Sequence, residues 1–147
     1  MSKTDRKKVE VETESLTQID ISKPHIANLN QDPQLSRKVR YAIEEAETKI
    51  GKRGAEVKND IEIGGMGIRK LQAVIRRVDD DFLMNPTFDG EESGCYLNGD
   101  MIDKEEKIFH LDRISFGTNN MFLVLIPETE PRGEVDEKVI DWDFAQN

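Results

Sequence analysis

The stretch CYLNGDMI, residues 95–102, gives the clearest indication of the fold. Asn98 and Gly99 separate two short segments, 96–97 and 101–102, that have strand-forming composition. A two-residue hairpin turn of type I′ needs positive φ at both central positions, and Asn-Gly is the pair that tolerates this best. The stretch therefore predicts a tight antiparallel β-hairpin.

Short apolar segments with turn residues between them continue on both sides of this hairpin. From Arg37 onward no segment keeps a period of 3.6 for more than about ten residues, which is typical of an all-β chain. The predicted strands are 39–43, 48–50, 61–63, 72–78, 82–84, 95–97, 101–102, 107–109, 114–115 and 121–126. Residues 42–50 have helix-forming composition, and only their neighbours favour a strand there. About ten to eleven strands predict two antiparallel sheets packed face to face as a β-sandwich.

The composition divides the 147 residues into one folded unit and two tails. Residues 1–23 are polar and charged, and we interpret them as a flexible N-terminal arm or linker. Residues 24–127 form the predicted domain, beginning with a short apolar stretch and an Asn-rich turn. Residues 128–147 form an acidic tail. Its Trp142 and Phe144 are expected to dock onto another surface or to begin a following helix.

Charge and residue content narrow the possible functions. With 21 basic and 30 acidic residues the formal charge is −9, which argues against nucleic-acid binding over the whole surface. No apolar run reaches the roughly 20 residues of a membrane span, so we expect a cytoplasmic protein without membrane insertion. A single cysteine excludes an internal disulfide, and the acidic turns do not follow a calcium-loop pattern. No catalytic arrangement, metal site or cofactor is predicted.

A basic region runs from residue 49 to residue 77, where eight basic residues face three acidic ones. Such a region can bind a phosphate or an acidic segment through charge-assisted hydrogen bonds, and the alternative is a solvated basic face without a ligand. The glycine-rich stretch GGMGIRKLQAVI, residues 64–75, lies within it. It leads into a predicted strand instead of a helix and has no Gly-Lys-Ser/Thr, so we do not interpret it as a nucleotide loop.

Several motifs in order resemble a known family. The motifs are PHIANLNQDPQLS, TKIGKR, DIEIGGMGIRKLQAVI, CYLNG and HLDRISFGTNNMFLVLIP, and IDWDFAQ follows them. Over residues 24–146 they resemble the forkhead-associated (FHA) domain of the kinesin-three class of cargo-transport kinesins, together with the sequence that follows it. The resemblance implies an FHA/SMAD-like sandwich and a reader of phosphothreonine peptides.

The resemblance also implies four candidate peptide-binding residues. Lys52, with Arg53 beside it, stands where the family has its phosphate-gripping arginine, and Arg69 stands where a serine holds the phosphate. Ser93 stands where an asparagine binds the peptide backbone. Lysine supplies charge without the bidentate fork of arginine, so atypical or lost phosphothreonine recognition is expected.

Five further positions are implied to be structural. Gly51 is the family glycine that holds a turn, and Gln72 replaces the structural histidine. Gly94 matches the glycine after the peptide-binding position, and Asn98 and Gly99 match the family hairpin.

The implied function is a non-catalytic interaction domain of a kinesin-like microtubule motor. Its partners would be a phosphorylated or acidic peptide, or a neighbouring coiled coil, with roles in cargo or adaptor binding, dimerisation or autoinhibition. The chain contains no motor ATPase domain. The alternative is a stand-alone FHA scaffold of a cytoskeletal or ciliary assembly. Both place the protein in a microtubule-associated assembly.

Overall fold

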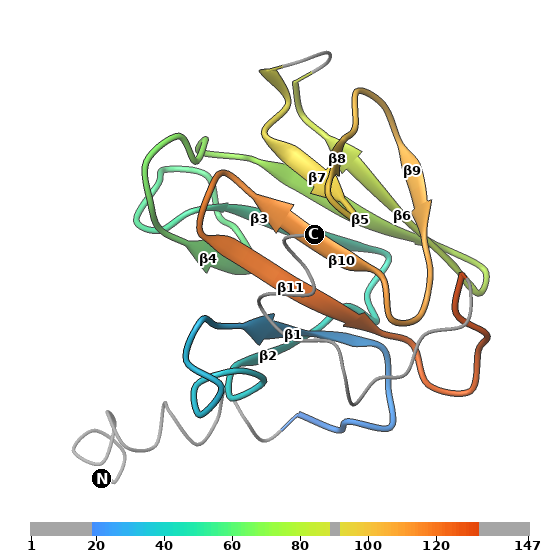
Figure 1. Cartoon of the computed structure of the whole chain (residues 1–147). Coiled ribbons are helices and arrows are strands. Elements are labelled where there is room, and N and C mark those ends of the chain that lie inside the picture. Colours follow the sequence, from blue (N-terminus) through green and yellow to red (C-terminus); the bar gives the residue numbers. More distant parts are fainter. Residues whose placement is uncertain (1–18, 89–91, 133–147) are drawn as a thin grey trace, which may run out of the picture.

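A computed structural model describes residues 19–88 and 92–132 of the chain. Most of the expected N-terminal arm, the acidic turn at 89–91 and residues 133–147 lie outside the described residues. Within them the chain is all-β, as predicted (Figure 1). No helix in this part has both the length and the apolar character needed to cross a membrane.

Eleven strands are formed by the described residues. In chain order they are β1 (His25–Leu29), β2 (Arg40–Ala42), β3 (Glu47–Lys52), β4 (Ile61–Ile63), β5 (Ala73–Val78), β6 (Asp81–Pro86), β7 (Cys95–Leu97), β8 (Asp100–Met101), β9 (Glu106–Ile108), β10 (Arg113–Phe116) and β11 (Asn120–Leu125). All ten predicted strands overlap an observed strand, and the helix-like composition of 42–50 is overridden by its neighbours.

The strands form two sheets, seen in Figure 1 as two layers. The six-stranded sheet has the order β2-β1-β11-β10-β7-β8, and the five-stranded sheet has the order β4-β3-β5-β6-β9. The expectation of purely antiparallel sheets was wrong in one place, because β3 and β4 pair in parallel with Ile50 opposite Ile61. The loop between them folds back on itself, and the Asp60 N–H donates to the carbonyl of Lys49.

The core lies between the two sheets and follows the alternation of side chains along each strand. Ile26, Phe122 and Val124 from the six-stranded sheet meet Ile75 and Met84 from the five-stranded sheet in one buried cluster. The same alternation leaves the outer face of β3 polar, since Glu47 and Lys49 are exposed while Thr48 and Ile50 are buried. This alternation is the reason that a strand could be predicted here from the sequence.

Strand β1 was not predicted, and its burial explains why. Four of its five residues are buried, on both faces of the strand. A strand covered on both sides shows no alternation of apolar and polar residues, so a period-2 pattern cannot reveal it. The expected turn follows β1, where the Gln34 N–H donates to the carboxylate of Asp32.

Residues 128–132 were assigned to the tail by sequence, and this boundary was wrong. Pro131 makes a β-bridge with His110, and the guanidinium of Arg132 donates to the carboxylate of Asp112. The folded unit therefore extends at least to Arg132.

Candidate functional site

Loops from both sheets converge at one end of the sandwich and carry the predicted site residues. The Lys52 N–H at the end of β3 donates to the carbonyl of Arg69, at 2.9 Å. The Asn120 side chain at the start of β11 donates to the carbonyl of Gly64, at 2.7 Å. These bonds fasten the glycine-rich loop, residues 64–72, to one strand of each sheet.

Arg69 connects this loop to the loop that precedes β7. Its Nη1 donates to the carbonyl of Ser93 at 2.8 Å, and its Nη2 donates to the carbonyl of Glu92. Its guanidinium carbon lies 3.9 Å from the centroid of the Phe88 ring, which is a cation–π distance. The guanidinium is thus bound to protein groups on two edges and one face, and its main role is to hold two loops together.

Gln72 is wholly buried and holds the backbone of Arg69 in place. Its Oε1 accepts a hydrogen bond from the Arg69 N–H at 2.9 Å, and its Nε2 donates to the carbonyl of Ser93 at 3.0 Å. A buried amide is stable only when its donors and acceptors have partners, and these contacts supply them. The arrangement agrees with a structural role for Gln72.

Ser93 is placed differently from what the resemblance implied. Its side chain is 0% exposed, and its hydroxyl accepts a hydrogen bond from the Cys95 N–H. A peptide on the surface cannot reach this hydroxyl. The neighbouring Gly94 has φ of 68°, and an added Cβ would stand 2.9 Å from Nε2 of Gln72. Both residues therefore shape the loop from inside.

Gly51 lies within β3, so the implied turn role was wrong. It pairs with Glu62 of the parallel strand β4 and is buried. An added Cβ would meet the carbonyl oxygen of Lys70 at 2.0 Å and the Asn59 side chain at 2.5 Å. Glycine is required because the 64–72 loop crosses directly over the strand.

Lys52 and Arg53 are the exposed members of the predicted set. Arg53 makes one long contact, from its Nη2 to the carbonyl of Glu62 at 3.4 Å. Burial raises the pKa of the nearby Tyr41 phenol, and the positive charge of Arg53 partly opposes that shift. Lys70 is also exposed and lies 3.8 Å from a carboxylate oxygen of Glu56. The positive charge available to a ligand at this end thus comes from β3 and the loops beside it.

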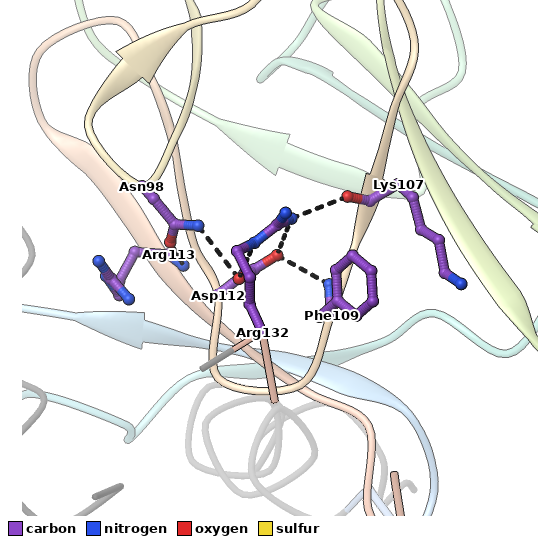
Figure 2. A network of polar contacts seen from close by, with 6 residues as sticks. All are labelled: Asn98, Lys107, Phe109, Asp112, Arg113 and Arg132. Atoms are coloured by element: carbon purple, nitrogen blue, oxygen red, sulfur yellow. Dashed lines mark hydrogen bonds and ion pairs between the residues drawn. The ribbon is translucent and has the colours of Figure 1, made fainter. Parts of the chain in front are cut away.

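The predicted hairpin is confirmed. Asn98 and Gly99 have φ of 52° and 92°, and β7 pairs with β8 around them. The Asn98 side chain accepts a hydrogen bond from the Arg113 N–H and donates to the carboxylate of Asp112, as Figure 2 shows. The hairpin is therefore tied to the turn that precedes β10.

Asp112 is the centre of a polar network that sequence reasoning missed (Figure 2). Its carboxylate accepts hydrogen bonds from the Phe109 N–H at 2.8 Å and from two nitrogens of Arg132, at 2.9 and 3.1 Å. Arg132 also donates to the carbonyl of Lys107 and lies over the Phe109 ring. Nothing in the sequence pairs an aspartate with an arginine 20 residues away, so no local signal could have identified this network.

Phe88 is the other residue that the sequence did not indicate. It is 49% exposed and forms an apolar surface beside Arg69. An aromatic residue directly before an acidic turn is a weak signal, because exposed single apolar residues are common. Among residues 19–88 and 92–132 there is no group of three or more His, Cys, Asp and Glu side chains that could hold a metal ion.

Three comparisons relate the chain to known proteins. Residues 48–117 match the family model described as FHA domain. Kinesin-like protein KIF1B of Homo sapiens is 30% identical over 132 residues, covering 84% of this chain and 7% of that protein. Kinesin-like protein KIF28 of Rattus norvegicus is 31% identical over 123 residues, covering 84% of this chain and 11% of that protein. The chain thus spans only a small part of the length of these relatives.

Solved structures agree on the fold. The FHA domain of the CT664 protein from Chlamydia trachomatis superposes with a TM-score of 0.56 at 16% identity, covering 69% of this chain and 96% of that one. Mycobacterium tuberculosis EmbR in complex with a low affinity phosphopeptide also gives 0.56, at 17% identity, covering 86% of this chain and 31% of that one.

Proposed function

This chain contains an FHA domain of the type found in kinesin-like proteins, and we propose that it binds an acidic or phosphorylated segment of a partner protein in an atypical way. FHA domains are non-catalytic interaction modules. The observation that carries the proposal is that the basic residues at this end of the sandwich have different roles. Arg69 holds two loops together, whereas Lys52 and Arg53 are exposed beside them.

The different roles of these basic residues predict how a ligand is held. An exposed lysine and an exposed arginine on a fixed strand end attract a phosphate or a carboxylate mainly by charge, in a solvated setting. Arg69 has further N–H groups besides those that bind the carbonyls of Glu92 and Ser93. They can contact a ligand only from the position in which these two hydrogen bonds hold the guanidinium. We therefore expect weak, salt-sensitive affinity, with modest preference for phosphothreonine over glutamate at the same position.

Peptide titration tests this function. Fluorescence anisotropy would be measured with matched pools of phosphothreonine, glutamate and threonine peptides. We expect binding in the order phosphothreonine, glutamate, threonine, and at least a fivefold loss for Lys52→Ala and for Arg53→Ala. Lys104→Ala removes another exposed positive charge, between β8 and β9, and is the matched control. Equal affinity for all three pools, unchanged by Lys52→Ala and Arg53→Ala, would contradict the proposal.

The role of the whole protein is a further part of the proposal. Kinesin-like relatives favour a microtubule-associated protein in which this domain binds cargo, an adaptor or a neighbouring coiled coil, or contributes to dimerisation or autoinhibition. The alternative is an FHA scaffold without a motor, in a cytoskeletal or ciliary assembly. A motor domain in the same reading frame would support the first. Its absence from the full transcript, with the protein still on microtubules, would support the second.

A further inference from the structure

A groove lies on the side of the sandwich where both sheets end. β8 is the last strand of the six-stranded sheet and β9 is the last strand of the five-stranded sheet, and residues 102–105 connect them. The groove, which we call the edge groove, has a volume of about 410 Å³. Its lining includes Leu97, Asp100, Met101, Ile102, Asp103 and Glu106. It lies beyond the end of β7 opposite to Ser93, so it is separate from the candidate peptide site.

The edge groove contains apolar surface that meets solvent. Met101 is 39% exposed, Leu97 is half-buried and Ile102 is 6% exposed. Ile102 belongs to the core between the sheets and Leu97 packs against that core, so the apolar surface continues from the interior to the outside. Covering apolar surface with another apolar group is favourable by about 25 cal/mol per Å². An apolar side chain of a ligand is therefore stabilised here.

The backbone of β8 can form hydrogen bonds with an extended segment. Asp100 stands opposite Leu97 in the hairpin, and the Ile102 N–H donates to the carbonyl of Cys95. In an antiparallel pair, every second residue directs its N–H and C=O away from the partner strand. Met101, between Asp100 and Ile102, thus directs both groups to the open side of β8. Extended peptides add to a sheet edge through such groups.

The edge of β9 differs from the edge of β8, because it is already engaged by the chain itself. Arg132 donates to the carbonyl of Lys107 in β9 at 3.1 Å, as Figure 2 shows. Of the two edge strands at the groove, β8 is therefore the one that an added segment can pair with.

Carboxylates give the edge groove its charge. Asp100 and Asp103 are exposed, and Glu106 is half-buried. Arg132 also lines the groove, but it already donates two hydrogen bonds to Asp112. Because the described ranges hold no group of three or more His, Cys, Asp and Glu side chains suited to a metal ion, the carboxylates fit a ligand with several separate positive charges. Apolar surface among spread carboxylates is complementary to a segment with both apolar and basic side chains.

We propose that the edge groove binds an extended segment of a partner protein in which apolar residues are interleaved with lysine or arginine. The segment lies beside β8, pairs with the backbone of Met101 and places an apolar side chain in the groove. Its basic side chains lie near Asp100, Asp103 and Glu106. The domain thus presents two surfaces of opposite charge to its partners. The proposal does not depend on binding at the candidate peptide site.

Fluorescence anisotropy with three labelled peptides tests the proposal on the full 147-residue chain. Each peptide has about seven residues, which span roughly 20 Å when extended. Lysine and leucine alternate in the first peptide, glutamate replaces lysine in the second, and serine replaces leucine in the third. We expect saturable binding of the first, at least threefold weaker binding of the third and no binding of the second. Equal affinity for the first and second, or for the first and third, would overturn the proposal.

Charge reversal in the groove locates the binding. The double change Asp100→Lys and Asp103→Lys should weaken binding of the lysine–leucine peptide at least fivefold. Glu45→Lys together with Glu47→Lys makes the same change in net charge at two exposed positions on the other sheet and the loop before it, and is the matched control. Equal losses in the two double variants would overturn the proposal, because net charge alone would then attract the peptide.

A further variant keeps the test informative if the charge reversal does not fold. Met101→Thr keeps a strand-forming residue at the edge and removes most of the apolar surface, so it should weaken the lysine–leucine peptide at least threefold. Binding of phosphothreonine peptides should stay as in wild type, which separates this groove from the candidate peptide site. Unchanged affinity of Met101→Thr for the lysine–leucine peptide would overturn the proposal. A dimer in light scattering that this peptide dissociates would also overturn it, because the groove would then hold a second copy.

Discussion

Arg132 donates two hydrogen bonds from its guanidinium to the carboxylate of Asp112, which is 2% exposed, while Arg132 itself keeps 45% of its side chain exposed. The pair joins the end of the described chain to the turn before β10 and, through Asn98, to the β7–β8 hairpin. Three segments that are distant in sequence therefore depend on one carboxylate.

Removal of this carboxylate should destabilise the domain. Asp112→Ala leaves the Phe109 N–H and the Asn98 amide without their acceptor, and we expect a loss of about 2–4 kcal/mol in the free energy of unfolding. Arg132→Ala should lose less, about 1–2 kcal/mol, because its side chain is half exposed. Urea denaturation measures both. Arg132→Lys keeps the charge without the fork, and wild-type stability in that variant would show that the geometry is unimportant.

A methyl group at position 51 should be poorly tolerated. The Cβ of Gly51→Ala would lie 2.0 Å from the carbonyl oxygen of Lys70, a backbone atom that moves only with the whole loop. We expect a loss of about 3 kcal/mol or failure to fold. Gly64→Ala is the matched control, since its Cβ would approach only the flexible end of Arg53, at 3.1 Å. Equal thermal stability of the two variants would disprove the crossing-loop explanation.

Arg69 should contribute more to stability than its position on the surface suggests. Arg69→Ala loses the bonds to the carbonyls of Glu92 and Ser93 and the stack on Phe88, so we expect about 1–2 kcal/mol of destabilisation. Amide exchange near residues 92–94 should become faster. Arg53→Ala, with one long hydrogen bond, should change stability by less than about 0.5 kcal/mol. If both variants lose the same stability, the two loops do not depend on Arg69.

Cys95 gives a pH dependence whose sign follows from its burial. Burial raises the pKa of its thiol from 9.0 to about 11. Below pH 9 the thiol is neutral in the folded and unfolded states, so its contribution is complete. Between pH 9 and 11 the unfolded thiol ionises while the folded one stays neutral, so stability falls, by no more than about 3 kcal/mol.

Comparison with Cys95→Ala isolates this effect from other groups that titrate at high pH. The difference in unfolding free energy between wild type and variant should shrink as the pH rises from 8.5 to about 10.5. A thiol reagent should label native Cys95 only as fast as the domain unfolds, since the side chain is 0% exposed. Rapid labelling of the native protein would show that the site opens locally.

Much of the fold was readable from local pattern. Thr48, buried between the exposed Glu47 and Lys49, carries the alternation that reveals a half-buried strand. Asn98 and Gly99 revealed their turn because few residue pairs accept positive φ at two successive positions. Strand β1 was not predicted, because both of its faces are covered and its residues therefore show no alternation.

The candidate site was readable only in part. The structure brings Lys52, Arg69 and Ser93 together, yet the motifs did not distinguish an exposed side chain from a buried one. Ser93 lies inside, and Arg69 is engaged by carbonyls of a loop more than 20 residues away. Such roles depend on contacts between segments, and no residue type or spacing encodes them locally.

The sequence by itself determined the all-β class, the hairpin at Asn98 and Gly99 and the basic region between residues 49 and 77. These follow from local backbone preferences, side-chain period and charge, which are properties of neighbouring residues. Only the tertiary structure decided that Gly51 lies beneath a crossing loop, that Asp112 captures Arg132 and that β1 is covered on both faces. Each of these results from the close approach of segments far apart in the chain, where packing and the pairing of buried polar groups select one arrangement.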